Sequence, residues 1–462
     1  MYLAFLWNYH RNRMIERRAQ NMGLCTFKGG VHPYDGKELS KDKPIRDYLP
    51  KGDLVYPLSQ HIGAPAKPVV AVGDEVLKGQ MIAEAGGFVS APIYASASGK
   101  IKAIEPRRTV VGDMVNAIIL ENDGEFKEVE YQAVDDVSAL SKEEIMKRIQ
   151  DAGVVGMGGA GFPTHVKLSP KEPEKIDYII ANCAECEPYL TADYRRMVEE
   201  PEKLIEGMRI ILSMFDNAKG IFGVEDNKPD CIAKLRELVK NEPRMEVKAL
   251  KTKYPQGSER QLIYAATGRA INSTMLPADA GCIVDNVDTI VAIYHAVKFG
   301  MPLIQRIVTI TGDAVTEPQN LRVNIGTSFA ELLEAAGGTK VQPKKVIAGG
   351  PMMGFAMFDL NCPTTKTTGG LLLLAKDDVE EAEAQETACI NCGRCVAACP
   401  SRMVPSRLAD FAEQHRPEMF EAWHGMECME CGSCSYTCPA KRNLAQAIKS
   451  MRKTILANRR KK

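Results

Sequence analysis

Short runs of alternating apolar and polar residues fill residues 50–120, and glycine-containing turns separate the runs. Val69–Ile82, for example, is predicted to contain a strand, a Gly-Asp turn, a second strand and a Gly-Gln turn. Ser90–Ile101 has the same character. Because alternation with a period of two turns one face of each strand toward a core, the pattern predicts a small β sandwich inside an N-terminal module at residues 22–130.

Residues 140–300 alternate between helical and strand patterns. A helix is expected to begin at Ser141–Glu144, because a serine followed three residues later by a glutamate forms a capping box. The segments that follow are predicted to be a strand at Ile176–Ala181, a helix at 200–216, a strand at Gly220–Val224, a helix at Cys231–Lys240 and a strand at Met245–Leu250. Helices that alternate with strands predict an α/β domain with a mostly parallel sheet.

A third pattern covers residues 305–375. A strand is predicted at Arg306–Ala314, and a helix follows with Thr327 or Ser328 as its N-cap. Strands return at Val346–Ala348 and Gly354–Phe358. This order predicts a small β-grasp-like module.

The charge distribution adds two segments to this organisation. The chain has 462 residues, 45% of them hydrophobic, and a net charge of zero, so no overall field indicates nucleic-acid binding. Residues 376–386 are predicted to be a solvated acidic linker. Residues 446–462 form a basic tail, predicted to be a helix lying against an acidic partner or a membrane surface, or else a solvated helix end.

The beginning of the chain and its apolar runs bear on targeting. Residues 1–21 are apolar first and basic second, which is the reverse of a secretory signal, so we expect an extension outside the fold. No run approaches the roughly 18 apolar residues of a membrane span.

Two cysteine runs near the C-terminus have the spacing C-x2-C-x2-C-x3-C followed by proline. This is the ferredoxin pattern for [4Fe–4S] clusters, in which the fourth cysteine of each run ligates the cluster of the other run. We therefore assign the first cluster to Cys389, Cys392, Cys395 and Cys438, and the second to Cys428, Cys431, Cys434 and Cys399. A pair of zinc sites is the alternative, although zinc motifs typically separate two C-x2-C pairs by a longer gap. The runs predict a protein that transfers single electrons.

The other six cysteines are scattered, which argues against a disulfide framework and favours a reducing cytosol, as in an anaerobe. Cys183 and Cys186 form a C-x2-C pair, but no second pair lies near them in the sequence. We interpret them as loop thiols and not as a third metal site.

A glycine-rich loop is the second candidate functional feature of the sequence. Gly156, Gly158, Gly159 and Gly161 match G-x-G-x-x-G. A dinucleotide fingerprint follows a strand, whereas here a helical segment comes before the loop, which argues against a Rossmann site. A phosphate cradle fits, because glycines present bare backbone N–H groups. A tight structural turn is the alternative.

The loop belongs to a longer series of motifs that includes Phe162–Lys167, Asn182–Pro188, Tyr254–Glu259 and Asp285–Thr289. Over roughly residues 140–440 this series resembles the FMN- and NADH-binding subunit of respiratory NADH dehydrogenase. The two cluster motifs, Lys28–Pro33 and the N-terminal sandwich are more similar to the C subunits of Rnf electron-transport complexes. The sandwich resembles biotinyl/lipoyl domains, but a swinging arm is not expected because the hairpin near Gly86–Ser90 lacks a lysine.

The resemblance implies a multidomain α/β and α+β fold. Its parts are an N-terminal β sandwich-hybrid module at 22–130, an FMN/NADH-binding α/β domain at 140–300, a β-grasp-like module of the soluble-ligand-binding type at 305–375 and a helical two-cluster ferredoxin-like domain at 387–445.

The resemblance also implies site residues. The four glycines would face the FMN phosphate and ribityl, and Lys167 would supply positive charge. Asn182, Glu185 and Asn286 would hydrogen-bond the flavin, within segments that include Gly257 and Thr289. Glu187 and Glu259 would meet NADH, and Phe162 would stack on the NADH adenine or the flavin. For four of these side chains an alternative stays open: a surface lysine at Lys167, a core position at Phe162, and solvated acids at Glu187 and Glu259.

This chain departs from the dehydrogenase pattern near the flavin. Cys183, Ala184 and Cys186 replace Ala, Asp and Ser, and Ser258 replaces the first of two glutamates. The departures affect the expected NADH geometry more than the glycine loop.

The implied function is hydride exchange between NAD(H) and FMN, with single electrons passing through two [4Fe–4S] clusters. The implied context is a peripheral subunit on the cytoplasmic face of the cell membrane, in a complex that couples ferredoxin:NAD oxidoreduction to Na+ or H+ transport. Its partners would be the other membrane and ferredoxin-like Rnf subunits, with membrane contact through them or through the basic tail, and no nucleic acid. The alternatives are a flavin/iron–sulfur cobalamin reductase and a non-catalytic electron wire.

Overall fold

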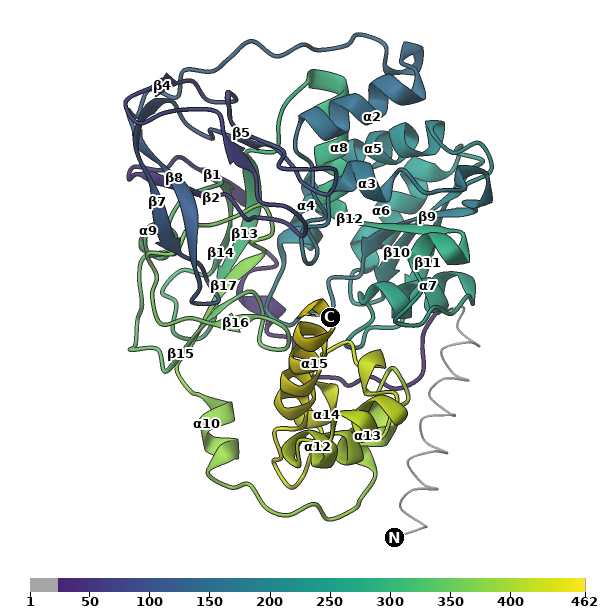
Figure 1. Cartoon of the computed structure of the whole chain (residues 1–462). Helices are drawn as coiled ribbons and strands as arrows, with labels where there is room; N and C mark the ends of the chain where they lie inside the picture. Colours follow the sequence, from purple (N-terminus) through teal and green to yellow (C-terminus); the bar gives the residue numbers. More distant parts are fainter. Residues whose placement is uncertain (1–23, 462) are drawn as a thin grey trace.

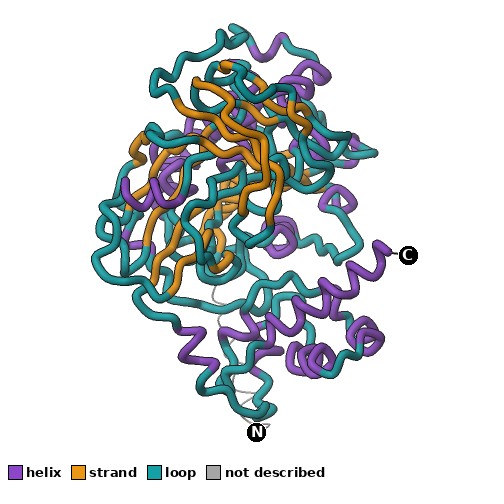
Figure 2. Tube along the Cα trace, turned by 60° about the vertical axis from the view of Figure 1, so that its left-hand side comes forward, coloured by secondary structure: helices purple, strands orange, loops and turns teal. Residues whose placement is uncertain are grey.

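The computed structural model describes residues 24–461, so the expected extension at 1–21 lies outside the described part. The α/β domain and the two β modules lie side by side in Figure 1, and the helical cysteine-rich domain is attached below them. Figure 2 shows the same separation, with the strands gathered in the upper bodies and the C-terminal helices standing apart.

The N-terminal module is a sandwich of two antiparallel sheets. One sheet has the order β2-β8-β7-β4 and the other β3-β5-β6. The strands are β2 (Leu54–Pro57), β3 (Lys67–Pro68), β4 (Glu75–Val76), β5 (Met81–Glu84), β6 (Ile93–Tyr94), β7 (Gly99–Arg108) and β8 (Met114–Asn122). Side chains such as Ile82, Ile101 and Ile118 fill the core between them. The sandwich is as predicted, but the first strand of the Val69–Ile82 segment does not form, because β3 ends at Pro68.

Residues 24–48 of the predicted N-terminal module at 22–130 lie outside the sandwich and pair with the other domains. Cys25 pairs with Leu250 and Val31 with Tyr254, both in the α/β domain. β1 (Ile45–Tyr48) then joins the β-grasp sheet, parallel to β14 (Gln319–Asn324). These pairings join segments that are distant in the sequence, and period-two alternation gives no information about such partners.

The α/β domain is built on a fully parallel sheet in the order β11-β10-β9-β12. Its elements are α2 (Lys142–Asp151), α3 (Thr164–Lys167), β9 (Tyr178–Cys183), α4 (Ala192–Glu199), α5 (Pro201–Ser213), β10 (Lys219–Glu225), α6 (Pro229–Val239), β11 (Met245–Leu250), α7 (Glu259–Thr267), β12 (Cys282–Asn286) and α8 (Val287–Phe299). The capping box at Ser141 and Glu144 is present. The predicted helices and strands are all found, with shifted ends.

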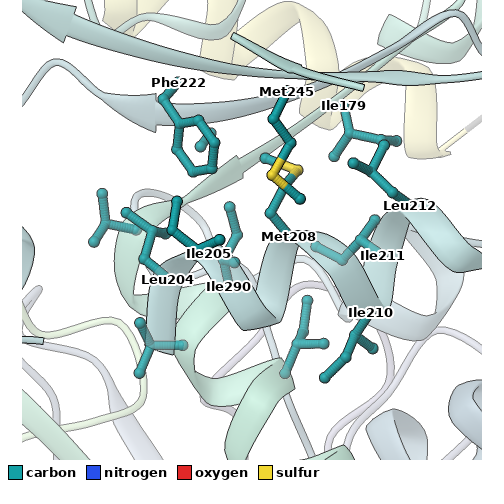
Figure 3. Packing of buried hydrophobic residues seen from close by; sticks show 14 of the residues in the cluster. Ile179, Leu204, Ile205, Met208, Ile210, Ile211, Leu212, Phe222, Met245 and Ile290 are labelled. Carbon is teal, nitrogen blue, oxygen red and sulfur yellow. The ribbon is translucent and has the colours of Figure 1, made fainter. Parts of the chain in front are cut away.

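Apolar side chains cover both faces of this sheet. Figure 3 shows α5 lying beneath the strands, with Met208 and Leu204 directed toward Phe222 and Met245. α7 covers the opposite face, where Leu262 packs with other buried apolar residues. Because all four strands are parallel, their carboxyl ends meet at one edge, the usual place for a ligand in such folds.

The β-grasp-like module has a mixed six-stranded sheet in the order β1-β14-β13-β17-β15-β16. The elements not yet given are β13 (Gln305–Thr311), α9 (Phe329–Ala335), β15 (Lys345–Ala348), β16 (Phe355–Ala356) and β17 (Gly370–Leu374). Of the two predicted N-caps, Ser328 is the one used, because its hydroxyl accepts the Glu331 N–H.

The C-terminal domain consists of short helices around the cysteine runs. They are α11 (Arg394–Ala398), α12 (Pro405–Glu413), α13 (Pro417–Ala422), α14 (Ser433–Tyr436) and α15 (Leu444–Lys461), after the linker helix α10 (Asp378–Glu383). The predicted boundary at 445 falls inside α15. Ile448, Met451 and Ile455 are buried with Leu408 and Phe420, so much of the expected tail is part of this domain's core.

A buried lysine joins three of the modules. Lys366 is 1% exposed, and its Nζ donates to Pro92 O of the sandwich (2.6 Å) and to Gly153 O of the α/β domain (2.7 Å). Its own N–H donates to Gln60 Oε1. No carboxylate within the described residues pairs with it, and burial lowers the pKa of Lys366 to about 7.

We expect Lys366→Met to lower the thermal midpoint of the cofactor-free chain, because two buried carbonyls lose their donor. The folded pKa lies below the unfolded value of 10.5, so the unfolded chain binds more protons between pH 7 and 10.5. The wild type should therefore gain stability over the variant as pH rises through this window, by at most about 1.4 kcal/mol per unit. Melting curves at pH 7, 8 and 9 measure this, with exposed Lys340→Met as control. A difference that stays constant with pH would contradict it.

Candidate functional site

The carboxyl edge of the parallel sheet opens onto a cavity of ≈ 2400 Å³. Its walls come from the α/β domain, the β-grasp-like module and the second cysteine run. Every cofactor residue predicted from the sequence except Thr289 lines it, namely Gly156, Gly158, Gly159, Gly161, Phe162, Lys167, Asn182, Glu185, Glu187, Gly257, Glu259 and Asn286. Phe162 is half-buried on the wall and is not a core residue.

The glycine loop is a closed turn between α2 and α3. Gly156 N–H donates to Phe162 O (2.8 Å), and Val155 pairs with Pro163. Gly161 has φ of +71°, and a Cβ there would lie 3.0 Å from Gln60 O. Gly158 and Gly159 are exposed and line the cavity, and a Cβ at Gly158 would lie 3.0 Å from Asn286 Cβ. The loop thus offers backbone N–H groups without side chains, which fits an anionic phosphate.

Two residues hold this loop and the neighbouring helix in place. Thr289 lies behind the wall, where its Oγ1 accepts the Met157 N–H (3.0 Å). Asn286 Oδ1 accepts the Asp288 N–H (2.9 Å), and its Nδ2 donates to Asp193 Oδ2 (2.7 Å). Both side chains therefore shape the site, and the Asn286 amide already has protein partners.

The segments after β9 and β11 are joined across the cavity. Asn182 Nδ2 donates to Gly257 O (2.7 Å), and Gly257 N–H donates to Cys186 Sγ (3.1 Å). Cys183 is buried at the end of β9. The interpretation as a loop thiol therefore fits Cys186, which hydrogen-bonds in the loop, whereas Cys183 belongs to β9 and packs in the core of the α/β domain.

The carboxylates of Glu185 and Glu187 differ from the expectation, because both bind protein N–H groups. Glu185 Oε1 accepts the Asp193 N–H (2.7 Å) at the start of α4, and Lys37 Nζ lies 3.7 Å from Oε2. Glu187 Oε1 accepts the N–H groups of two residues in the β-grasp-like module, Met352 (2.7 Å) and Met353 (3.1 Å). The two carboxylates fix the loops that surround the cavity.

Glu259 is different, because within the described residues its carboxylate accepts no hydrogen bond. Burial raises its pKa, and the nearby Lys167 opposes that rise. Lys167 Nζ donates to Val284 O (2.7 Å) and lies 3.2 Å from Asp285 Oδ1. Burial acts to lower the pKa of Lys167, but Asp285 and Glu259 outweigh it and leave the pKa raised. The cavity wall thus holds a cationic lysine close to an available carboxylate.

The structure gathers the eight cluster cysteines into the two predicted sets. Cys389, Cys392, Cys395 and Cys438 line one smaller cavity. In the second set, burial raises the pKa of Cys434, and its neighbours Cys428, Cys431 and Cys399 raise it further. In the described part of the chain, no three Cys, His, Asp or Glu side chains converge tightly enough for a single metal ion. A four-iron cluster instead takes thiolates around a cube.

The two sets have different surroundings. Cys389 and Cys392 are exposed. Cys431 is buried, lines the large cavity and packs with Val31, Tyr254 and Ala398. The second set is therefore adjacent to the large cavity, and the first set reaches the surface.

Sequence reasoning missed one wall of the cavity. Arg306 at the start of β13, together with Thr365, Thr367 and Thr368 before β17, lines it. These residues lie outside every motif considered, and an arginine inside a predicted strand gives no signal of a ligand. The four threonines at 364, 365, 367 and 368 are the sequence feature that could have indicated this wall.

Together, the glycine-lined cavity and the paired cysteine sets define a flavin- and iron–sulfur-type electron-transfer protein. Family profiles agree: an RnfC barrel sandwich hybrid domain matches residues 25–125, a Nuo51 FMN-binding domain 149–295, an SLBB domain 307–356 and a 4Fe-4S dicluster domain 388–442.

Curated relatives identify the family. The C subunit of a proton-translocating ferredoxin:NAD(+) oxidoreductase complex from Clostridium ljungdahlii is 46% identical, over 93% of this chain and 94% of that protein. The C subunit of a Na(+)-translocating ferredoxin:NAD(+) oxidoreductase complex from Acetobacterium woodii is 43% identical, over 96% and 99%. The C subunit of an ion-translocating oxidoreductase complex from Haemophilus influenzae is 39% identical, over 85% and 61%. The chain belongs to the family of C subunits of Rnf-type ferredoxin:NAD oxidoreductase complexes.

Within residues 24–461, no helix combines the length and apolarity needed to cross a bilayer.

Proposed function

We propose that this chain exchanges a hydride with NAD(H) in the large cavity and passes single electrons through two [4Fe–4S] clusters. The observation that carries the proposal is the lining of the cavity, which includes both the glycine loop and Cys431. Bound FMN would convert between the two-electron chemistry of NADH and the one-electron chemistry of the clusters. The protein supplies position, charge and exclusion of water.

The flavin end of the proposal rests on the glycine loop. The N–H groups of Gly158 and Gly159 would bind the FMN phosphate, and Gly161 would let the loop turn without a side chain. Lys167 supplies positive charge, while Asn182 and Asn286 shape the wall beside the flavin.

NAD(H) would enter through the part of the cavity that Phe162 and Glu259 line. An aromatic ring gives a stacking surface, and a carboxylate without protein donors can accept ribose hydroxyl or amide hydrogens. Glu187 would contribute through the loop that it holds.

The cluster assignment gives an order of transfer. Cluster two, held by Cys428, Cys431, Cys434 and Cys399, would exchange electrons with the flavin because Cys431 reaches the cavity. Cluster one, held by Cys389, Cys392, Cys395 and Cys438, would exchange them with a partner protein because two of its ligands are exposed.

The names of the relatives extend the proposal to a complex that couples ferredoxin:NAD oxidoreduction to ion transport, with the other proteins of that complex as partners. We place this chain peripherally, on the cytoplasmic face. The basic end of α15 offers a further contact with an acidic partner or a membrane. Arg452 and Arg459 are already paired with Glu430 and Glu421, so exposed Lys453 would carry that contact.

The test is anaerobic purification of the full chain, reconstitution with iron, sulfide and FMN, and assay of NADH-dependent reduction of a one-electron dye. We expect about one FMN and eight iron atoms per chain, as two [4Fe–4S] clusters require, and an activity that disappears when FMN is omitted. A chain that takes up iron but no FMN would be an electron wire, and the proposal would fail.

A further inference from the structure

The β-grasp-like module forms one end of the cavity, and the side chain that it places there is a buried arginine. Arg306 is 4% exposed and lines the cavity. Its Nε donates to Thr368 O (3.2 Å). Its NH1 lies 3.6 Å from Asp288 Oδ2 and donates no hydrogen bond to any described residue. A buried guanidinium with an unused donor is costly unless a ligand completes it.

The neighbours of Arg306 place it at the end of the cavity that the glycine loop lines. Gly161 of the glycine loop lies against Thr367, because a Cβ on Gly161 would be 2.9 Å from Thr367 Cγ2. The Asp193 carboxylate acts to raise the pKa of Arg306, and it accepts a hydrogen bond from Asn286. Asn286 in turn lies against Gly158, because a Cβ on Gly158 would be 3.0 Å from Asn286 Cβ. The arginine, the threonine loop and the glycine loop therefore share one corner.

The threonine loop (Thr365–Thr368) is held firmly in that corner. Thr365 N–H donates to Thr368 Oγ1 (2.9 Å), and the hydroxyls of Thr365 and Thr367 lie 3.2 Å apart. Between them, Lys366 is bonded to Gly153 O, just before the glycine loop begins. The loop thus presents hydroxyl groups on a fixed backbone, opposite the N–H groups of the glycines.

Charge limits what this corner accepts. Asp288 is near Arg306, but Arg196 also binds it, with Nε 2.7 Å from Oδ1. Arg196 also pairs with Glu200, and Asp193 acts on Arg306 from another direction, so the part of the corner that is not already hydrogen-bonded among the described residues is the NH1 group of Arg306. A guanidinium, hydroxyls and glycine N–H groups together are donors suited to a phosphate.

We propose that Arg306 and the threonine loop bind the phosphate ester of FMN, so that the β-grasp-like module completes the flavin site instead of binding a separate ligand. This inference rests on the proposed function, because it requires FMN in the cavity. The pyrophosphate of NAD(H) has the same chemistry, and the experiment separates the two sources.

The experiment measures the affinity of the full, iron-reconstituted, FMN-free chain for FMN and for riboflavin by quenching of flavin fluorescence. Riboflavin lacks the phosphate, so the ratio of the two dissociation constants isolates the phosphate contact. We expect Arg306→Gln to weaken FMN about 10-fold or more and riboflavin little, because one charge-assisted hydrogen bond is lost. Thr367→Val should reduce the preference for FMN over riboflavin less than Arg306→Gln does. Arg306→Lys should retain part of that preference.

Arg322→Gln is the matched control. Arg322 lies on neighbouring β14, pairs with Glu200 and Asp47, and does not line the cavity, so both flavins should bind as in the wild type. If Arg306→Gln does not fold, as judged by circular dichroism, the ratio is read from Arg306→Lys and Thr367→Val. An unchanged ratio in these variants would overturn the inference.

A second arm measures NAD+ binding to the FMN-loaded chain. If Arg306→Gln weakens the binding of NAD+ but not the binding of FMN, the guanidinium binds the dinucleotide and the FMN assignment is overturned. Failure of the wild type to bind FMN at all would instead refute the proposed function, and so the two failures are distinguishable.

Discussion

Replacing Cys431 with alanine is expected to stop electron flow from the cavity to the clusters while NADH still reduces the flavin. Cys431 is the ligand of the proposed cluster two that lines the cavity and packs against Tyr254. Without cluster two, the first cluster loses its connection to the flavin. Mixing with NADH under anaerobic conditions should bleach flavin absorbance, and the electron paramagnetic resonance signal of a reduced cluster should be nearly absent.

Cys392→Ala is the matched variant, because Cys392 is an exposed ligand of cluster one. In this chain NADH should still reduce the remaining cluster, whereas delivery of electrons to an external partner protein should be lost. If Cys431→Ala still shows a reduced cluster and Cys392→Ala does not, the order of the two clusters is the reverse of the one proposed.

Gly161→Ala is expected to remove FMN from the purified chain. The residue has φ of +71°, which costs an alanine about 1–2 kcal/mol. The new Cβ would also lie 2.9 Å from Thr367 Cγ2 and 3.0 Å from Gln60 O, so the loop must shift. Loss of two charge-assisted bonds to the phosphate would weaken FMN about 100-fold or more. Flavin titration measures the loss.

Gly268→Ala controls for backbone strain alone. Gly268 ends α7 with φ of +75°, and a Cβ there meets nothing within 4 Å. It should lower the melting temperature to a similar extent and leave FMN binding intact. Equal loss of FMN in both variants would mean that the glycine loop has no specific role.

The sequence predicted the grouping of the cysteines better than it predicted the arrangement of the cavity wall. Fixed spacings such as C-x2-C-x2-C bring thiolates together by local geometry, so the grouping of Cys389, Cys392 and Cys395 could be predicted. The glycines at 156–161 could be recognised as a tight loop for the same reason, since the loop closes on itself and lines the cavity.

Roles that depend on distant segments could not be predicted. Glu185 and Glu187 were expected at the ligand, yet their carboxylates bind N–H groups of α4 and of the Met352–Met353 segment. Arg306 was missed because its place in the cavity depends on how β13 packs against the α/β domain. The pairing of residues 24–48 with the β11 segment and with β14 was not predicted, because nothing in their local sequence indicates these partners.

The most direct test of the account is an anaerobic NADH titration of the reconstituted full chain, followed by visible absorbance. We expect the flavin band to bleach and the iron–sulfur bands to bleach with it, all within this one polypeptide. Bleaching by dithionite but not by NADH would contradict it, because electrons from NADH would then have no entry through this cavity.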